Sequence, residues 1–264
     1  MRLATGKLIA EKDGPVGRLT FNNPARRNAI SFAMWQALPT LIEEFASDDA
    51  IRVIILKGAG GQAFSAGNDI SEFKQRRSSK QGIAKYDAAT HRAYDALISI
   101  DKPTIAMIEG FCIGGGLEVA LLCDIQIAAN NARFAMTPAK LGLGYKFDDV
   151  RLLVSNVGPK YAKEILFTGR QFSAEEARKM GIVNRVVPAQ GLADFVKEYA
   201  QTIADNAPLS IRAIKKIIAE AAKGPGQADL DLCERLVDAC HASEDCKEGQ
   251  HAFAEKRKPN FTGR

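Results

Sequence analysis

The sequence predicts an α/β core over residues 1–190, followed by a helical C-terminal region over residues 191–264. Three observations lead to this fold class. Two apolar, β-branched runs, Ile51–Gly58 and Pro103–Gly110, have the composition of strands that are buried on both faces. Strand-like and helix-like patterns alternate around them, and each run is followed by a glycine-containing turn. From Gln190 onward the pattern is helical only, as expected of a smaller appendage to one main core.

The first elements are a β-hairpin and an amphipathic helix. Residues 7–13 and 16–21 are strand-like and flank a Gly-Pro pair, which predicts a hairpin. Ser31 is a suitable N-cap for the helix that follows, and Pro39 inside this helix is expected to bend or weaken it. The inward face of the helix carries apolar residues at helical spacing: Met34, Trp35, Leu38, Leu41, Ile42 and Phe45.

The middle of the chain repeats the order of strand, turn and helix. A polar loop after the first buried run precedes a helix that is predicted over about residues 80–100. The second buried run continues through a glycine-rich turn into another helix, and residues 124–129 and 133–137 supply further strands. Two helices should follow, one beginning at Asp148 and one with Pro159 near its first turn.

A short helix and a last strand complete the predicted core. Ser173 and Glu176 form a capping box for a helix that ends at Gly181, before a strand at residues 182–187. Four helical stretches follow, at residues 193–205, 208–223, 228–242 and 243–258. Because amphipathic helices of this kind often pack on a partner, we expect an oligomer built through the C-terminal region.

The composition is that of an ordinary globular protein. The chain is 46% hydrophobic and 25% charged, and its net charge of +5 suits an anionic small molecule but is too weak to indicate nucleic-acid binding. Five cysteines without a CxxC pair argue against a disulfide framework and a thiolate metal site. No run approaches the ~18 apolar residues of a membrane span, and no apolar leader begins the chain. We therefore expect a cytoplasmic protein that binds neither membranes nor nucleic acid.

Two glycine-containing turns carry the candidate chemistry, because each follows a buried strand. They are Phe64–Asp69 and Gly110–Glu118, and the second one opens a helix at Gly115. Glycine leaves backbone NH groups unblocked, and a helix N-terminus adds a positive dipole end. The NH groups of Ala66 and Gly115 are therefore the predicted donors to an anionic oxygen, although two structural turns would give the same pattern. The spacing matches neither a GxGxxG dinucleotide motif nor a P-loop.

With these turns in place, the sequence resembles the enoyl-CoA hydratase/isomerase family, also called crotonases, over nearly the whole chain. The shared motifs are PARRNAI (Pro24–Ile30), AFSAGNDI (Ala63–Ile70), KPTIAMIEGFCIGGGLEVALLCD (Lys102–Asp124), GIVNRVVP (Gly181–Pro188) and FAEKRKPNF (Phe253–Phe261). The resemblance implies a spiral of ββα turns and an acyl-CoA thioester as substrate, without a separate cofactor. It also implies C-terminal helices that assemble a homotrimer or a dimer of trimers.

Individual residues carry over from this resemblance. Ala66 and Gly115 match the oxyanion-hole pair, and the backbone that lies along CoA matches Ala66, Gly67, Asn68, Asp69 and Ile70. Phe253 and Lys256 match C-terminal CoA contacts that the family often gives to a neighbouring subunit. Arg27 is a candidate for the CoA phosphates, because arginine pairs well with phosphate oxygens, although a plain surface charge is an equal explanation.

Glu118 occupies the place of the first of two hydratase glutamates. A carboxylate in the first turn of a helix suits a base or a water-orienting role, and its alternative role is to compensate the helix dipole. The second hydratase glutamate falls at Pro138, which cannot transfer a proton. This departure argues against two-glutamate hydration and against a double-bond isomerase that depends on the second position.

The stretch FAMTPAKLGLGY around Pro138 is similar to that of the methylmalonyl-CoA decarboxylases of the same family, and Thr137 and Tyr145 then match substrate-site positions. Losing carbon dioxide already generates an enolate, so decarboxylation needs mainly an oxyanion hole and an acid. Asn68, however, replaces a histidine of that motif. This replacement alters the group that would handle the carboxylate and leaves the reaction type open. Because of Pro138, we expect decarboxylation of a substituted malonyl-CoA to be the better activity, with Glu118 and Tyr145 as catalytic side chains.

Two alternatives remain. The first is ordinary hydration by Glu118 with a non-standard acid, for which Tyr145 and Asp149 are the first candidates. The second is a family member that binds CoA or RNA without catalysis. The three histidines have no metal-ligand spacing, so we expect no metal site.

Overall fold

In the computed structural model, which describes residues 6–76 and 78–264, the described strands form two sheets. The strands of the six-stranded sheet, in spatial order, are β1 (Leu8–Asp13), β2 (Val16–Phe21), β3 (Val53–Gly58), β5 (Thr104–Ile108), β7 (Ile125–Ala129) and β10 (Arg185–Val187). Those of the four-stranded sheet are β4 (Ala63–Ser65), β6 (Phe111–Ile113), β8 (Arg133–Ala135) and β9 (Phe172–Ser173). The strand expected at residues 182–187 is shorter in the structure, because β10 begins only at Arg185.

The predicted hairpin and the two predicted central strands are confirmed. β1 and β2 pair antiparallel at the edge of the large sheet, with Asp13 opposite Val16 across the turn. From β2 to β10 every pairing in this sheet is parallel, and β3 lies next to β5 in its interior. Strands buried on both faces suit continuous β-branched runs, which explains the composition of these two segments.

Helices cover the sheets in a repeating order. Their bounds are α1 (Phe32–Ser47), α2 (Phe73–Arg76), α3 (Lys80–Ser99), α4 (Gly115–Leu122), α5 (Phe147–Thr168), α6 (Ala174–Lys179), α7 (Leu192–Ala204), α8 (Pro208–Ala221), α9 (Leu230–His241) and α10 (Glu244–Glu255). Short 3-10 helices occur at Pro24–Arg26, Ile70–Glu72, Ala139–Leu141 and Ala189–Gly191. The units β3–β4–α3, β5–β6–α4 and β7–β8–α5 each place one strand in each sheet before a helix, so the ββα spiral is confirmed.

Local sequence signals explain several helix boundaries. The Ser31 side chain accepts a hydrogen bond from the NH of Met34, as expected of an N-cap, and α1 continues through Pro39. α5 is interrupted at Gly158, whose φ of 72° is not helical, so the two helices predicted in this region meet at a kink. The Ser173–Glu176 capping box at the start of α6 is also present.

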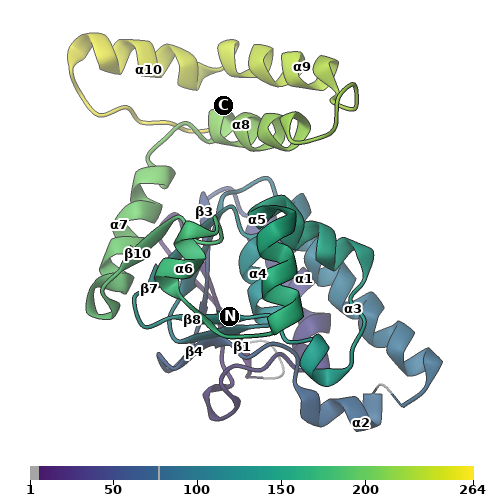
Figure 1. The fold of residues 1–264 in the computed structure, drawn as a ribbon. Coiled ribbons are helices and arrows are strands. Elements are labelled where there is room, and N and C mark those ends of the chain that lie inside the picture. Colours follow the sequence, from purple (N-terminus) through teal and green to yellow (C-terminus); the bar gives the residue numbers. More distant parts are fainter. Residues whose placement is uncertain (1–5, 77) are drawn as a thin grey trace.

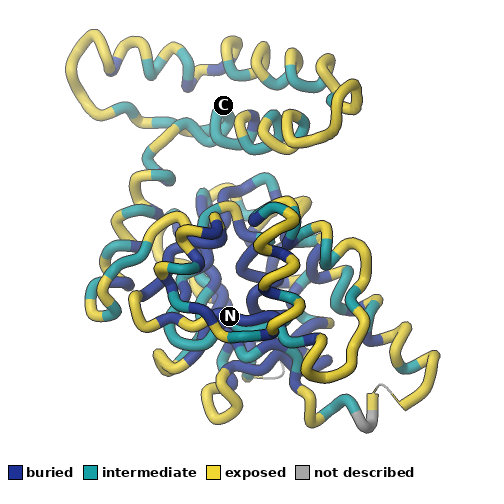
Figure 2. The backbone as a smooth tube through the Cα atoms, viewed as in Figure 1, coloured by how far each residue is buried: buried dark blue, intermediate teal, exposed yellow. Residues whose placement is uncertain are grey.

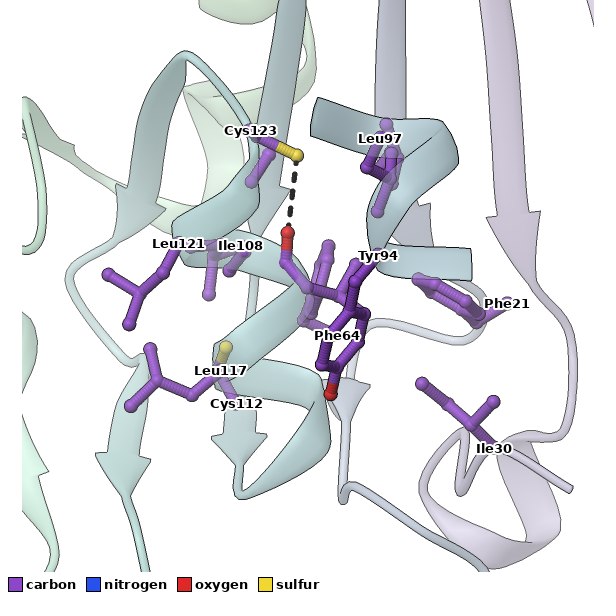
Figure 3. Close-up of a cluster of buried hydrophobic side chains, with 14 of the residues drawn as sticks. Phe21, Ile30, Phe64, Tyr94, Leu97, Ile108, Cys112, Leu117, Leu121 and Cys123 are labelled. Carbon is purple, nitrogen blue, oxygen red and sulfur yellow. Dashed lines mark hydrogen bonds between the residues drawn. The ribbon is translucent and has the colours of Figure 1, made fainter. Parts of the chain in front are cut away.

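Apolar side chains form a core on each face of the large sheet. The larger cluster fills the space between the two sheets and helices α1, α3, α4 and α5, and it includes Trp35, Phe64 and Phe134. Figure 3 shows part of this cluster around α4 and the Tyr94 ring. A smaller cluster joins α7 to the other face of the sheet through residues such as Val196. Figure 2 shows buried backbone concentrated in this layered part of the molecule.

Helices α8, α9 and α10 lie apart from the layered core (Figure 1). Lys215 of α8 connects them to it, because its Nζ is 2.8 Å from the Asp124 carboxylate and 3.0 Å from the carbonyl oxygen of Lys102. Large apolar side chains remain exposed on these helices, among them Ile218 and Phe253. The division near residue 190 and the assembly through this region stay predictions, and α7 itself packs on the sheet.

Candidate active site

A cavity of about 170 Å³ opens where the two glycine-containing turns meet helix α3 and the loop before α5. Its wall includes the turn after β4, the first residues of α4, one face of α3 and residues 137–146. The sequence predicted that the two turns would lie together. It did not predict α3 as the opposite wall, because the polar loop before α3 does not indicate which face of this helix turns inward.

The first turn is held tightly and needs glycine at its centre. Gly67 has a φ of +87°, and a Cβ on it would lie 2.7 Å from the carbonyl oxygen of Ile113, which is closer than real contacts allow. The Ser65 hydroxyl donates to the carbonyl oxygen of Asn28 and accepts from the NH of Gly67. The turn is therefore locked against the strand that leads into α4.

The predicted donor role of Ala66 is wrong in this structure. The NH of Ala66 donates to the carbonyl oxygen of Arg27 over 2.9 Å, so it is already used inside the protein. By contrast, the NH groups of Asn68 and Gly115 have no hydrogen-bond partner among the residues that the structure describes. Both residues line the cavity. The free donor pair is therefore Asn68 with Gly115.

Gly115 begins α4, so its free NH lies at the positive end of a helix. The next residue, Gly116, packs so closely on Ser65 that an added Cβ would lie 2.6 Å from the carbonyl oxygen of that residue. This contact sets the distance between the two turns. An anionic oxygen in the cavity would thus meet two backbone donors in a fixed arrangement.

Glu118 lies in the first turn of α4 and is only 6% exposed. The Tyr94 hydroxyl of α3 donates to its Oε2 over 2.5 Å, and the Tyr145 hydroxyl lies near enough to this carboxylate to influence its pKa. Burial raises the pKa of Glu118, and the two hydroxyls offset part of this rise. The sequence does not indicate a role for Tyr94 in the site, because a tyrosine within a helical apolar pattern cannot be distinguished from a core residue.

Burial and the neighbouring Glu118 carboxylate both raise the tyrosine pKa values. The pKa of Tyr94 lies well above its ordinary value, and that of Tyr145 is raised in the same direction. Both side chains therefore stay protonated and serve as hydrogen-bond donors. The Tyr94 hydroxyl thereby restrains the position of the Glu118 carboxyl group.

Pro138 is buried in the cavity wall, at the position where the resemblance would place the second glutamate. Its carbonyl oxygen accepts from the NH groups of Leu141 and Leu143, so it anchors the following turn. Another carboxyl group, that of Asp149 in α5, lines the same cavity. Burial raises the pKa of Asp149, while the charges of His91 and Lys146 oppose that rise.

The other predicted residues are divided between the cavity and the surface. Gly67, Ile70, Thr137 and Tyr145 line the cavity, together with Asn68, Gly115 and Glu118. Asp69 is buried beside the cavity and pairs with Arg26 at 3.0 Å. Burial tends to raise the pKa of Asp69, but its hydrogen bonds from Ser71 and Arg26 lower it overall.

Arg27, Phe253 and Lys256 lie outside the cavity wall within this chain. The Arg27 guanidinium stacks over the Phe111 ring at 4.6 Å and is exposed. Phe253 is 88% exposed on α10, and Lys256 follows at the end of this helix, which lies away from α3 and α4 (Figure 1). The CoA contacts of all three residues stay predictions, and those of Phe253 and Lys256 require a neighbouring subunit.

In the described part of the chain, no group of three or more His, Cys, Asp or Glu side chains is placed to hold a metal ion. None of the described helices is long and apolar enough to cross a membrane. Cys112 and Cys123 are buried, and burial raises the pKa of each thiol. These thiols therefore belong to the core.

The family described as Enoyl-CoA hydratase/isomerase matches residues 11–264. The chain belongs to the enoyl-CoA hydratase/isomerase family. A short-chain-enoyl-CoA hydratase of Clostridium acetobutylicum is 35% identical over 251 residues, which cover 95% of each chain. A carnitinyl-CoA dehydratase of Salmonella enteritidis is 36% identical over 262 residues, with 96% of this chain and 97% of the relative covered.

Solved structures of the enoyl-CoA hydratase/isomerase family agree with this fold. An enoyl-CoA hydratase/carnithine racemase from Magnetospirillum magneticum has a TM-score of 0.92 at 35% identity, covering 98% of this chain and 96% of that chain. An enoyl-CoA hydratase from Bacillus anthracis has a TM-score of 0.92 at 29% identity, covering 98% of this chain and 100% of the other. The α/β spiral fold predicted from the motifs is thereby confirmed.

Proposed function

We propose that this family member acts on an acyl-CoA thioester and decarboxylates a substituted malonyl-CoA. The observation that carries the proposal is that Glu118 and Pro138 line the same cavity. A buried carboxyl group with a raised pKa lies in the same cavity as two free backbone donors, and a buried proline replaces the second proton-transfer group. Such a site suits a reaction that needs an enolate hole and an acid but no strong base.

The thioester oxygen would lie between the NH groups of Asn68 and Gly115. These donors are preorganised by the Gly67 turn and by the start of α4, so they cost no rearrangement when charge develops on the oxygen. In a water-poor site, each such donor contributes about 3 kcal/mol to transition-state stabilisation. This pair replaces the one that we inferred from the sequence.

The first step breaks the bond between the α-carbon and the carboxylate carbon. Its electron pair forms the carbon–carbon double bond of the thioester enolate, the thioester oxygen takes the negative charge, and carbon dioxide leaves. In the second step the α-carbon takes a proton from the Glu118 carboxyl group, and solvent then restores that proton. One proton is consumed for each carbon dioxide released, and no cofactor is required.

Glu118 suits the acid role because burial favours its protonated form. Tyr94 would keep the carboxyl group aimed at the cavity, since its hydroxyl bonds to it, and Tyr145 lines the same cavity near this carboxylate. Thr137 and Tyr145 would contact the acyl group from the opposite wall.

The nucleotide end of CoA would bind outside the cavity. We propose that the backbone from Ala66 to Ile70 lies along the CoA arm, although the NH of Ala66 is already occupied, and that Arg27 meets a phosphate. Phe253 and Lys256 would reach CoA from a neighbouring subunit of a trimer or a dimer of trimers, because within one chain they lie on the distant α10. Each site would then be complete only in the oligomer.

A second candidate function is hydration of an enoyl-CoA. The observation in its favour is Asp149, a second carboxyl group in the cavity whose pKa is also raised. Glu118 and Asp149 could divide the two proton-transfer tasks that the family's two glutamates perform. The printed names of the relatives, which include hydratases and a dehydratase, agree with this candidate.

The deciding experiment compares methylmalonyl-CoA and crotonyl-CoA as substrates, with products followed by mass spectrometry. We expect decarboxylation to be the faster reaction of the wild type, and Glu118→Gln to reduce turnover by about 10²- to 10⁴-fold because the acid is lost. Tyr145→Phe should reduce it less, since Tyr94 still holds the carboxyl group. Asp149→Asn should behave like its exposed neighbour control, Asp148→Asn.

The opposite pattern would establish hydration. It consists of rapid water addition to crotonyl-CoA by the wild type, lost in both Glu118→Gln and Asp149→Asn but retained in Asp148→Asn. Absence of turnover with either substrate, combined with absent CoA binding, would instead indicate a family member that has lost catalysis.

A further inference from the structure

The Asn68 side chain has a fixed orientation. Its Oδ1 accepts a hydrogen bond from the Trp35 indole Nε1 over 2.8 Å and another from the Tyr86 hydroxyl over 3.1 Å. An indole N–H can only donate, so the amide atom that faces it must be the carbonyl oxygen. The Nδ2 amino group is therefore the atom on the other branch of the amide.

This amino group has no hydrogen-bond partner among the described residues. In the described part of the chain, every fully buried side-chain nitrogen or oxygen has a hydrogen-bond partner. Nδ2 of Asn68 has none, so it is not fully buried. Because Asn68 is only partly buried, its Nδ2 must keep accessible surface. Asn68 is one of the residues that line the cavity, so a ligand there lies near this side chain.

The amide also lies beside the second backbone donor. A Cβ built on Gly115 would be 3.5 Å from Oδ1 and 3.6 Å from Cγ of Asn68, which places the side chain against the residue with the free NH. Trp35 lies against the same residue, since its Cζ2 is 3.5 Å from that Cβ. The backbone NH of Asn68, its side-chain amide and Gly115 thus occupy one end of the cavity.

We propose that the Asn68 side-chain amide is a third hydrogen-bond donor to the thioester oxygen. This inference deepens the proposed function and rests on its placement of that oxygen between the Asn68 and Gly115 NH groups. The amide is preorganised, because Trp35 is fully buried and Tyr86 is 2% exposed, so their bonds hold it in place before substrate arrives. Trp35 is then a positioning residue that acts through Asn68.

The test measures the bound thioester carbonyl directly. Isotope-edited infrared spectroscopy of propionyl-CoA, labelled with ¹³C at the carbonyl and bound to the whole enzyme, reports the hydrogen bonding of that oxygen without requiring turnover. We expect a shift to lower frequency in the wild type and a smaller shift in Asn68→Asp. Aspartate keeps the acceptor for Trp35 and Tyr86 but has no N–H donor, which makes it the matched variant if Asn68→Ala fails to fold.

Kinetics provide the second readout. Loss of one oxyanion donor lowers kcat by about 10²- to 10³-fold, and the KM should change little because the bond strengthens as charge develops. Trp35→Phe keeps the amide but removes the bond that orients it. It should lower kcat less than Asn68→Ala, and its carbonyl band should lie between those of the wild type and Asn68→Ala.

The outcomes separate this inference from the proposed function. An equal carbonyl shift in the wild type, Asn68→Ala and Asn68→Asp would overturn the third donor while leaving the backbone pair intact. No shift in the wild type would overturn the oxyanion hole itself. A loss of affinity confined to methylmalonyl-CoA, with the propionyl-CoA band unchanged, would place the amide on the leaving carboxylate and would also overturn the inference.

Discussion

Tyr94→Phe isolates the contribution of one hydroxyl to the titration of Glu118. The Tyr94 ring packs edge-on against Trp35 at 5.6 Å between centroids and stacks near His91 at 6.5 Å, and phenylalanine can keep both contacts. What the substitution removes is the 2.5 Å hydrogen bond to Oε2 of Glu118. That bond favours the ionised carboxylate, so its loss must raise the pKa of Glu118 further.

The magnitude follows from the strength of a hydrogen bond to a charged group. Such a bond contributes about 1.5–3 kcal/mol, and one pKa unit corresponds to about 1.4 kcal/mol. Removing the hydroxyl should therefore raise the pKa of Glu118 further, because the ionised carboxylate loses the stabilisation of this bond, about 1.5–3 kcal/mol. If protonated Glu118 is the acid of a decarboxylation, activity falls as the pH rises through this pKa, so the falling limb of the profile moves to higher pH.

The assay is the dependence of kcat on pH for the wild type, Tyr94→Phe and Tyr161→Phe, the last being a half-exposed tyrosine of α5 outside the cavity wall. Tyr161→Phe should retain the wild-type profile. A rising limb that moves upward in Tyr94→Phe would mean that ionised Glu118 is the active form, as hydration requires. A profile that stays in place, or moves to lower pH, would refute the assigned role of the hydrogen bond.

Three further predictions concern stability and assembly. The raised pKa of Glu118 gives a stabilising contribution that is complete below its unfolded pKa and is lost as the pH rises through the folded pKa. The melting temperature of Glu118→Gln relative to that of the wild type should therefore increase from pH 4 to pH 8 in differential scanning fluorimetry. A constant difference would contradict this. Gly67→Ala should lower the free energy of unfolding by about 2–4 kcal/mol in urea titration, because the positive φ of Gly67 and the nearby Ile113 carbonyl oxygen exclude a Cβ. The control is Gly191→Ala, which should not lower it, because a Cβ at Gly191 would have open space around it. Ile218→Asp should dissociate the oligomer in sedimentation and raise the KM for acyl-CoA; dissociation with an unchanged KM would exclude contacts from a neighbouring subunit.

Much of the fold could be predicted because its signals are local. The buried strands β3 and β5 are continuous β-branched runs, and the caps at Ser31 and Ser173 each involve residues within one turn of helix. Short-range patterns of this kind can be recognised in the sequence without knowing which segments pack against them in space. The strand at residues 182–187 was overestimated because apolar residues there pack in the core without joining the sheet.

The candidate site was predicted in part. Glu118, Gly115 and the replacement at Pro138 follow from motif positions, and all three line the cavity. Tyr94 and Trp35 were not distinguished from core residues, because their apolar rings satisfy the helical pattern and their polar atoms reveal a role only through partners in other elements. Asp149 was predicted only as a candidate for the non-standard acid of a hydratase, and the structure places it in the cavity wall.

By itself, the sequence determined the family, the order of the ββα units and the presence of Glu118 and Pro138 at the two motif positions, since each depends on residue identity at fixed spacing. Only the tertiary structure decided which backbone NH groups are free. Ala66 and Asn68 lie two positions apart in one turn, but the Arg27 carbonyl oxygen occupies the NH of Ala66 and leaves that of Asn68 available. Availability of a donor depends on which acceptor the folded chain brings within 3 Å, and that acceptor lies 39 residues away in the sequence.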